Sequence, residues 1–162
     1  MKKAFTLIEL LIVISVLGII AALVIPEMKG HAAKTKEAAT KDNLRILRNA
    51  IEVYAAQHNG TPPGYSSGTP SAETFIDQLT LASDAGGGTA APGTPGYDYG
   101  PYLPNIPENS FNDLADVTVL ADGATFPAEA TGDAGWIYKP ATKDLRLDYP
   151  GTDSIGETYY EY

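Results

Sequence analysis

Residues 3–25 read KAFTLIELLIVISVLGIIAALVI, and this stretch decides the fold class of the chain. From residue 5 to residue 25 only Thr6, Glu9 and Ser15 carry polar side-chain atoms. These 21 residues, at about 1.5 Å of rise each, form a helix of about 32 Å, close to the ~30 Å thickness of the bilayer hydrocarbon. We therefore expect residues 5–25 to form a transmembrane helix.

The residues around this segment indicate its orientation. Lys2 and Lys3 precede it, and positive charges stay on the cytoplasmic side, so the N-terminus is expected to be cytoplasmic and the C-terminal body outside. A cleaved secretory signal is an alternative, with Ala21 and Ala22 as small residues for cleavage, and a buried core helix is another. The segment is longer than the ~7 to 15 apolar residues of a secretory signal, and it is apolar on all faces, which favours a membrane span.

The helical pattern continues into a second, amphipathic half over residues 26–58. Pro26 lacks a backbone N–H and predicts a kink rather than a break. One apolar stripe follows at spacings of three and four, with further apolar residues that widen it: Leu44, Leu47, Ile51 and Tyr54, then Ile46, Ala50 and Val53. Asn59 and Gly60 predict the end of the helix, with the glycine available for a left-handed cap.

The remaining residues, 59–162, are expected to form a small head that covers this stripe. Thr69 is predicted as the N-cap and Pro70 as the first residue of a short helix ending near Ala82, and residues 84–102 as an irregular Gly/Pro connection. Four short strands are predicted at residues 117–120, 135–139, 145–148 and 158–162. The fold class is then α+β, a long kinked N-terminal helix packed on a small antiparallel sheet whose other face meets solvent.

Composition excludes several classes of function. Eleven Lys and Arg against 20 Asp and Glu give a net charge of −9, the wrong sign for a protein that binds nucleic acid through its phosphates. No Lys or Arg occurs between Arg48 and Lys139, so the head is acidic. The chain has no cysteine, which excludes disulfides, thiolate nucleophiles and Cys-ligated zinc.

The sequence offers little for catalysis. Residues 64–68, GYSSG, match the nucleophile elbow of α/β-hydrolases formally, but that elbow needs a preceding strand, a following helix and a later histidine. Pro and Gly flank the segment, and both histidines, His31 and His58, precede its serines. We therefore expect no enzymatic activity.

Only one weak metal site is suggested, in the C-terminal region. Asp148, Asp153 and Glu157 are spread around two glycines and could surround a calcium ion with help from carbonyl oxygens. Their spacing is not that of an EF-hand, so a solvated acidic loop is the favoured interpretation. No other cofactor is expected.

Residues 3–13, KAFTLIELLIV, resemble the class III prepilin signature of type IV pilins and type II secretion pseudopilins. Weaker similarity to the major, G-type pseudopilin extends through residues 50–60, 100–107 and 135–138. The family usually has Gly where this chain has Ala4. The calcium-binding loop of the major pseudopilin and the cysteine-closed loop of many pilins are not reproduced.

The resemblance implies a processing site and an assembly residue. It implies that a prepilin peptidase removes the leader, residues 1–4, by cutting between Ala4 and Phe5, and methylates the new amino group of Phe5. It also implies that Pro26 is the helix-kinking proline and that Glu9 is the single glutamate of the apolar helix. We hypothesise that Glu9 pairs with the Phe5 amine of a neighbouring subunit, or of its own helix at i, i+4, during assembly.

The function implied is that of a structural subunit in a type IV filament-like assembly. A periplasmic pseudopilus for type II protein secretion is the first choice, and a type IV pilus the second. The implied partners are further copies of the chain, related minor subunits and an inner-membrane platform with a cytoplasmic ATPase. The subunit would be a single-pass inner-membrane protein with a periplasmic or extracellular head. A signal-anchored binding domain that never polymerises is the alternative from another class.

Overall fold

The computed structural model describes residues 6–65 and 68–162, except the side chains of residues 23–30. It divides into two compact units, Met1–Lys36 and Glu37–Tyr162. Helix α1 spans Leu7–Gln57 and ends where the sequence predicts. Asn59 and Gly60 adopt positive φ angles of 54° and 84°, and the Gly60 amide donates to the Ala55 carbonyl at 2.7 Å, which closes the last turn.

Within the second unit, α1 supplies one wall of the hydrophobic core. The predicted stripe is confirmed, since Leu44, Leu47, Ile51 and Tyr54 are at most 2% exposed. The predicted widening is only partly right. Ala50 is buried, but Ile46 is 37% and Val53 48% exposed, because the elements packed on α1 cover a narrower strip of its surface.

The short helix α2, Ala72–Thr80, begins later than predicted. Its N-cap is Ser71, whose hydroxyl accepts from the Thr74 amide at 3.1 Å, and not Thr69. Pro70 is not helical but forms a β-bridge with Tyr65. Ser71 caps better because its extended backbone aims its hydroxyl at the free amides of the first turn.

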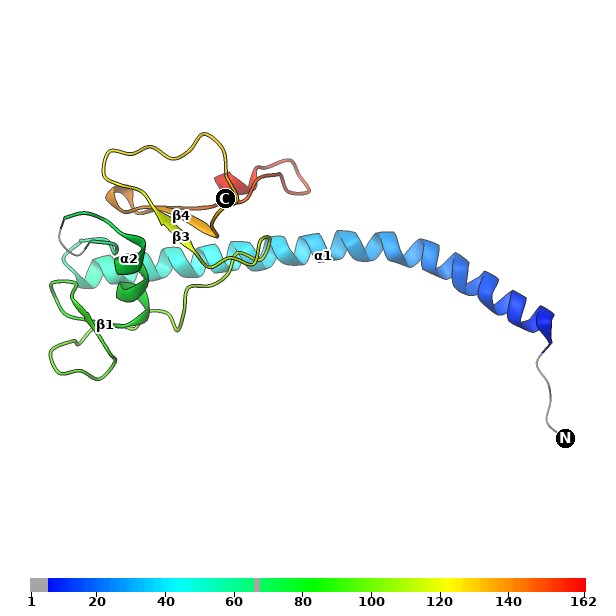
Figure 1. Ribbon diagram of the computed structural model, residues 1–162, viewed down its shortest axis with the longest axis horizontal. Coiled ribbons are helices and arrows are strands. Elements are labelled where there is room, and N and C mark those ends of the chain that lie inside the picture. The colour runs from blue at the N-terminus through cyan, green and yellow to red at the C-terminus, as the bar shows by residue number, and fades with distance from the viewer. Residues whose placement is uncertain (1–5, 66–67) are drawn as a thin grey trace. The chain divides into compact units, whose positions relative to one another are not determined.

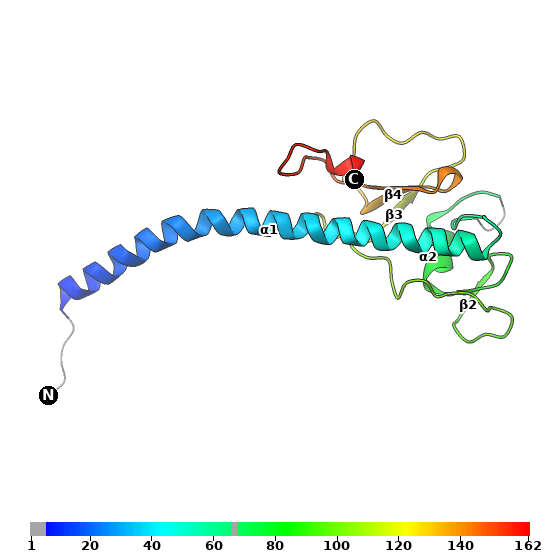
Figure 2. The same ribbon diagram turned by 180° about the vertical axis from the view of Figure 1, so that it is seen from behind.

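In the described part of the head, five short strands form two sheets. Figures 1 and 2 show where the labelled strands lie. Strands β1 (Ala82–Ser83) and β2 (Thr89–Ala90) pair antiparallel. The sequence predicts neither strand: it places Ala82 at the end of the short helix and residues 89–90 in the irregular connection. Strands β3 (Val117–Val119), β4 (Trp136–Lys139) and β5 (Asp144–Leu147) form the second sheet in that order. Its β4–β5 pair is antiparallel, but its β3–β4 pair is parallel.

Two predictions about the strands are therefore wrong, and a third is only partly right. The sheet is mixed, because the long loop between β3 and β4 returns the chain to the end of the sheet where β3 began. The fourth predicted strand is a short 3-10 helix, η2, at Tyr159–Glu161. The outer face of the sheet, predicted to meet solvent, does so only in part: Thr118 on β3 is exposed, but its partner Ile137 on β4 is only 2% exposed.

The core lies between α1, α2 and the mixed sheet. Its largest fully buried side chains come from all three: Tyr54 from α1, Phe75 from α2, and Trp136 and Tyr138 from β4. The ring centroids of Phe75 and Tyr138 are 4.5 Å apart. The Trp136 indole N–H donates to the Pro107 carbonyl at 2.9 Å. This packing buries the stripe of α1, whereas Ile46 and Val53 on the same helix stay exposed.

Candidate functional site

Helix α1 begins with a reciprocal cap between Thr6 and Glu9. The Glu9 carboxylate accepts from the Thr6 amide at 2.9 Å and from its hydroxyl at 2.7 Å, while the Glu9 amide donates to the Thr6 hydroxyl at 3.3 Å. This is the capping-box arrangement, Thr-x-x-Glu, which satisfies amides that have no partner inside the helix. Glu9 therefore has a structural role in the single chain that our sequence interpretation missed, although the spacing was visible.

The helix surface that follows is apolar in every direction. Each large apolar side chain from Leu7 to Ile20 is exposed, by 48% at Val13 and up to 82% at Leu7. Successive residues are about 100° apart around a helix, so this run leaves no polar face. Its one hydroxyl besides Thr6, that of Ser15, donates to the Leu11 carbonyl at 2.7 Å. Such a surface requires lipid or other protein around it.

The structure describes only part of the predicted membrane and processing segment. Ala4 and Phe5 lie outside the described residues, so the cleavage site remains a prediction. Helix α1 continues through Pro26 without interruption, but the side chain of Pro26 is not described and the kink also remains a prediction. Among the residues whose side chains are described, no helix combines the length and hydropathy needed to cross a membrane.

Of the three calcium candidates, Asp148 is the anchor of a loop. It is 1% exposed, and its carboxylate accepts from the amides of Thr131, Gly132 and Ala134 at 2.7, 3.0 and 3.1 Å and from the Thr131 hydroxyl at 2.9 Å. Burial favours the neutral acid, but these hydrogen bonds outweigh it and hold the pKa of Asp148 below its usual value. The carboxylate thus joins the end of β5 to the loop that precedes β4.

Asp153 organises a different loop, at the C-terminal end of the chain. One of its carboxylate oxygens accepts from the amides of Ile155 and Glu157 at 2.9 and 3.0 Å, and the other accepts from the Tyr162 hydroxyl at 2.8 Å. Partial burial raises the pKa of Asp153, but these bonds and the nearby Lys41 ammonium lower it overall.

The structure does not bring the three carboxylates together as a metal site. The side chain of Glu157 is exposed, and Asp148 and Asp153 direct their oxygens at separate sets of internal donors. Across the described residues, no three Asp, Glu or His side chains form a group that could hold a metal ion. Calcium binding therefore has no support in the geometry.

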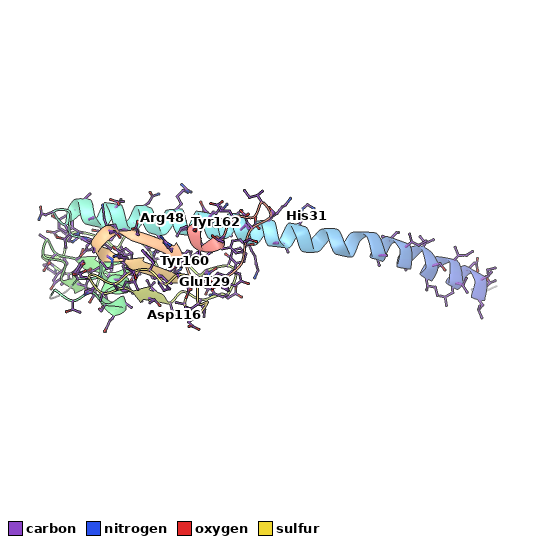
Figure 3. All side chains as sticks on the ribbon, turned by 90° about the horizontal axis from the view of Figure 1, so that it is seen from above. His31, Arg48, Asp116, Glu129, Tyr160 and Tyr162 are labelled. Atoms are coloured by element: carbon purple, nitrogen blue, oxygen red, sulfur yellow. The ribbon has the colours of Figure 1, made fainter. Side chains whose placement is uncertain are left out.

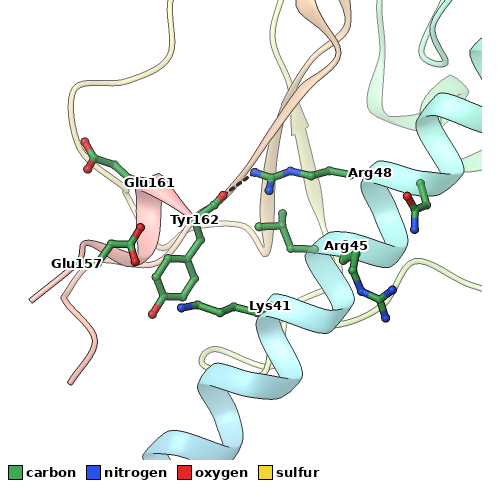
Figure 4. A pocket seen from close by; sticks show the side chains of 8 residues that line it. Lys41, Arg45, Arg48, Glu157, Glu161 and Tyr162 are labelled. Carbon is green, nitrogen blue, oxygen red and sulfur yellow. Dashed lines mark hydrogen bonds between the residues drawn. The ribbon is translucent and has the colours of Figure 1, made fainter. Parts of the chain in front are cut away.

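The C-terminal segment is fastened to α1 by two basic residues, shown in Figure 4. Arg48 donates to the backbone oxygens of Leu145 and Tyr162, and the Lys41 ammonium lies 3.8 Å from the centre of the Tyr162 ring. Figure 3 shows Arg48 and Tyr162 close together from above. Sequence reasoning missed this contact, because residues 114 positions apart leave no local pattern.

The segment that resembles a nucleophile elbow has other local contacts. The Gly64 amide donates to the Gln78 side chain at 2.8 Å, and that side chain donates to the Tyr65 carbonyl at the same distance. The serines that follow, residues 66 and 67, lie outside the described residues. No strand precedes Gly64, so the elbow's required setting is missing in the described part of this segment.

Comparison with known proteins supports the sequence signature. A family model described as the prokaryotic N-terminal methylation motif matches residues 1–25. The chain is 30% identical over 108 residues to the type II secretion system core protein G of Aeromonas hydrophila, a match that covers 67% of this chain and 66% of that protein. It is 26% identical over 122 residues to the protein of the same name in Klebsiella pneumoniae, covering 75% and 76%.

Pilins are similar over a shorter length. The type IV major pilin protein PilA of Myxococcus xanthus is 44% identical over 56 residues, which are 35% of this chain and 26% of that protein. No solved structure matches the chain significantly.

Proposed function

Because the chain belongs to the family of type II secretion pseudopilins and type IV pilins, we propose that it is a structural subunit of a type II secretion pseudopilus. The matches to core protein G extend over 108 and 122 residues, whereas the match to the Myxococcus pilin extends over 56. This difference favours a role in protein secretion. A type IV pilus subunit is the second candidate, supported by the higher identity of that shorter match.

The observation that carries the proposal is the exposed apolar surface of α1 between Leu7 and Ile20. In the proposed mechanism this surface lies in the inner membrane until assembly, with the N-terminus cytoplasmic and the head periplasmic or extracellular. It then leaves the bilayer and packs on the same helix of other subunits, exchanging lipid contacts for protein contacts. The subunit itself catalyses nothing, and an ATPase on the cytoplasmic side of an inner-membrane platform supplies the work.

Processing precedes assembly in this proposal. A prepilin peptidase removes residues 1–4 and methylates the amine of Phe5, and copies of the chain then polymerise with related minor subunits. The test is intact-mass analysis and sedimentation of membrane extracts from cells that make the full chain. We expect a mass lacking residues 1–4 and carrying one added methyl group, together with sedimenting filaments. A mature species that retains Met1 and never sediments would support a simple membrane anchor instead.

Glu9 is proposed to act by its charge in assembly, in addition to capping α1. Glu9→Gln separates these roles, because glutamine also serves in a capping box but has no charge to pair with the Phe5 amine. Thr6→Val is the matched variant, since it removes the capping hydroxyl and leaves the Glu9 charge. We expect Glu9→Gln to lower filament yield strongly with processing intact, and Thr6→Val to lower it little. The reverse order would assign Glu9 to capping alone.

A further inference from the structure

Only three large apolar side chains are exposed in the described part of residues 37–162. They are Ile46 and Val53 on α1 and Ile155 in the C-terminal loop, and they are 37%, 48% and 84% exposed. The other large apolar residues described in this unit are at least partly covered. Exposed apolar side chains are ordinary when they are scattered. Two features set these three apart: Ile155 is held rigidly, and the other two line one groove.

Ile155 stands on a loop whose backbone is tightly fixed. The Asp153 carboxylate accepts from the amides of Ile155 and Glu157, and the Asp153 amide donates to the Glu157 carbonyl at 2.8 Å. The Tyr162 hydroxyl and the Lys41 ammonium hold the same carboxylate from the side of α1. A side chain presented on such a loop loses little backbone entropy when it binds. We call it the Ile155 knob.

The two exposed residues of α1 line a groove of about 290 Å³. Its walls are four residues of α1 and two of the segment that packs beside it, and none is charged: Ile46, Asn49, Ala50, Val53, Tyr102 and Leu103. The Tyr102 hydroxyl donates to the Gln57 side chain at 2.6 Å, which fixes that wall. Lack of charge is typical of the centre of a protein interface. We call this hollow the α1 groove.

The knob and the groove lie on different sides of α1. Lys41 marks the side of the knob, because it contacts Asp153 and Tyr162. At about 100° per residue, Ile46, Ala50 and Val53 are rotated by roughly 120 to 180° from Lys41. The centre of the groove is also about nine residues farther along the helix, or roughly 14 Å. The two surfaces are therefore placed to meet between two copies of the chain.

We propose that the Ile155 knob of one subunit inserts into the α1 groove of the next subunit in the filament. The contact is heterologous, since different patches meet, and a repeated heterologous contact that does not close gives an open filament. For parallel helices it shifts one copy along the helix axis relative to the other, because the groove lies farther toward the C-terminal end of α1 than Lys41, the residue that marks the knob. The inference rests on the proposed filament function and adds the surface by which the heads recognise one another.

The small size of the contact identifies the occupant as a second copy. One isoleucine in one groove buries far less than the ~1,200 to 2,000 Å² of a stable independent interface. A separate soluble partner would need a larger exposed apolar surface to bind. In the described residues, the large exposed apolar surface is that of α1 from Leu7 to Ile20. A second copy that packs there through its own α1 is already held alongside, so a small contact suffices to set the position of its head.

Disulfide trapping in assembled filaments tests the contact, because the natural chain has no cysteine. The variant carries Ile155→Cys and Val53→Cys in the full chain, and mild oxidation follows filament isolation. We expect a ladder of cross-linked dimers, trimers and longer species, since each copy offers one thiol on each surface. The matched pair Ser154→Cys and Ala56→Cys uses exposed neighbours outside the proposed contact and should cross-link at least fivefold less.

Other outcomes overturn the proposal in recognisable ways. Filaments of normal yield without a ladder refute the contact and leave the filament function standing. Cross-linked dimers from Ile155→Cys alone show a knob-to-knob contact, and a cross-link to a different protein shows another occupant. If the unaltered chain forms no filaments, the proposed function fails and this inference fails with it.

Introducing charges at the contact gives an independent test that does not depend on thiol geometry. We expect Ile155→Asp to lower filament yield at least fivefold with processed subunit unchanged, and Ser154→Asp to have little effect. Adding Val53→Lys to Ile155→Asp should restore most of the yield, because an Asp–Lys pair then replaces the apolar contact. Equal yields from Ile155→Asp and Ser154→Asp would refute the proposal.

Discussion

Asp148→Asn tests whether one buried carboxylate holds the loop before β4. The substitution keeps the size of the side chain and one acceptor oxygen but replaces the other oxygen with an NH2 group. That group would face the Ala134 amide, which is itself a donor and lies in a buried residue. The Thr131 hydroxyl can rotate and accept instead, so the Ala134 amide is the group that loses its partner.

The expected cost follows from these contacts. An unsatisfied buried amide costs about 1 to 3 kcal/mol. The bonds from the Thr131 and Gly132 amides persist, but they lose the strengthening that an ionised acceptor gives, about 0.5 to 1 kcal/mol each. We expect Asp148→Asn to lower the free energy of unfolding at pH 7 by about 3 kcal/mol.

The same reasoning predicts how the difference in unfolding free energy between the natural chain and Asp148→Asn depends on pH. The pKa of Asp148 is lowered in the folded state, so its contribution is complete above its unfolded pKa of about 3.9. It is lost as the pH falls through the lower folded pKa, where the protonated acid resembles asparagine. The difference between the natural chain and Asp148→Asn should therefore shrink below about pH 4.

Urea unfolding of the fragment 30–162 from pH 7 to about pH 3 measures both effects. Asp133→Asn is the matched control, because it removes one negative charge from an exposed neighbour in the same loop, and it should change stability by less than about 0.5 kcal/mol. Equal effects of the two substitutions, or a difference that does not vary with pH, would refute the anchoring role of Asp148.

Three further predictions concern the head. The fragment 30–162 should be soluble and melt in one cooperative transition, because Leu44, Leu47 and Ile51 stay with the sheet they cover, and recovery only as aggregate would contradict this. Its melting temperature should not shift in millimolar calcium, since internal donors occupy Asp148 and Asp153, and a rise of several degrees would reveal a site. Gly135→Ala should lower the free energy of unfolding by more than about 3 kcal/mol, because its Cβ would lie 2.2 Å from the Leu114 carbonyl oxygen. Gly123→Ala, which meets no atom within 4 Å, should cost about 1 kcal/mol for its positive φ, measured in the same urea titration.

The helical parts of the fold were predictable because their signals are local. The stripe through Leu44, Leu47 and Ile51 and the stop at Asn59 and Gly60 need no knowledge of distant residues. The error at Ile46 and Val53 has a different origin. Periodicity predicts which side of a helix faces a core, but the width of the buried strip depends on how far the packed elements reach around it.

Strand pairing and carboxylate roles could not be predicted in the same way. A parallel or antiparallel partner for β3 depends on the path of a long loop, which its composition does not reveal. Asp148 and Asp153 have the oxygens that calcium prefers, but the same oxygens also accept from backbone amides. Only the position of the neighbouring amides decides between these uses.

Glu9 shows how one side chain can serve both the single chain and the assembly. Its carboxylate closes the first turn of α1 through Thr6, so the Thr6 and Glu9 amides have partners where the helix begins in an apolar setting. A carboxylate offers about four acceptor positions, and these two contacts use one of its two oxygens. The other oxygen is left to pair with a cationic amine from a neighbouring helix. Capping is therefore compatible with the proposed charge pairing, because it leaves one carboxylate oxygen of Glu9 available.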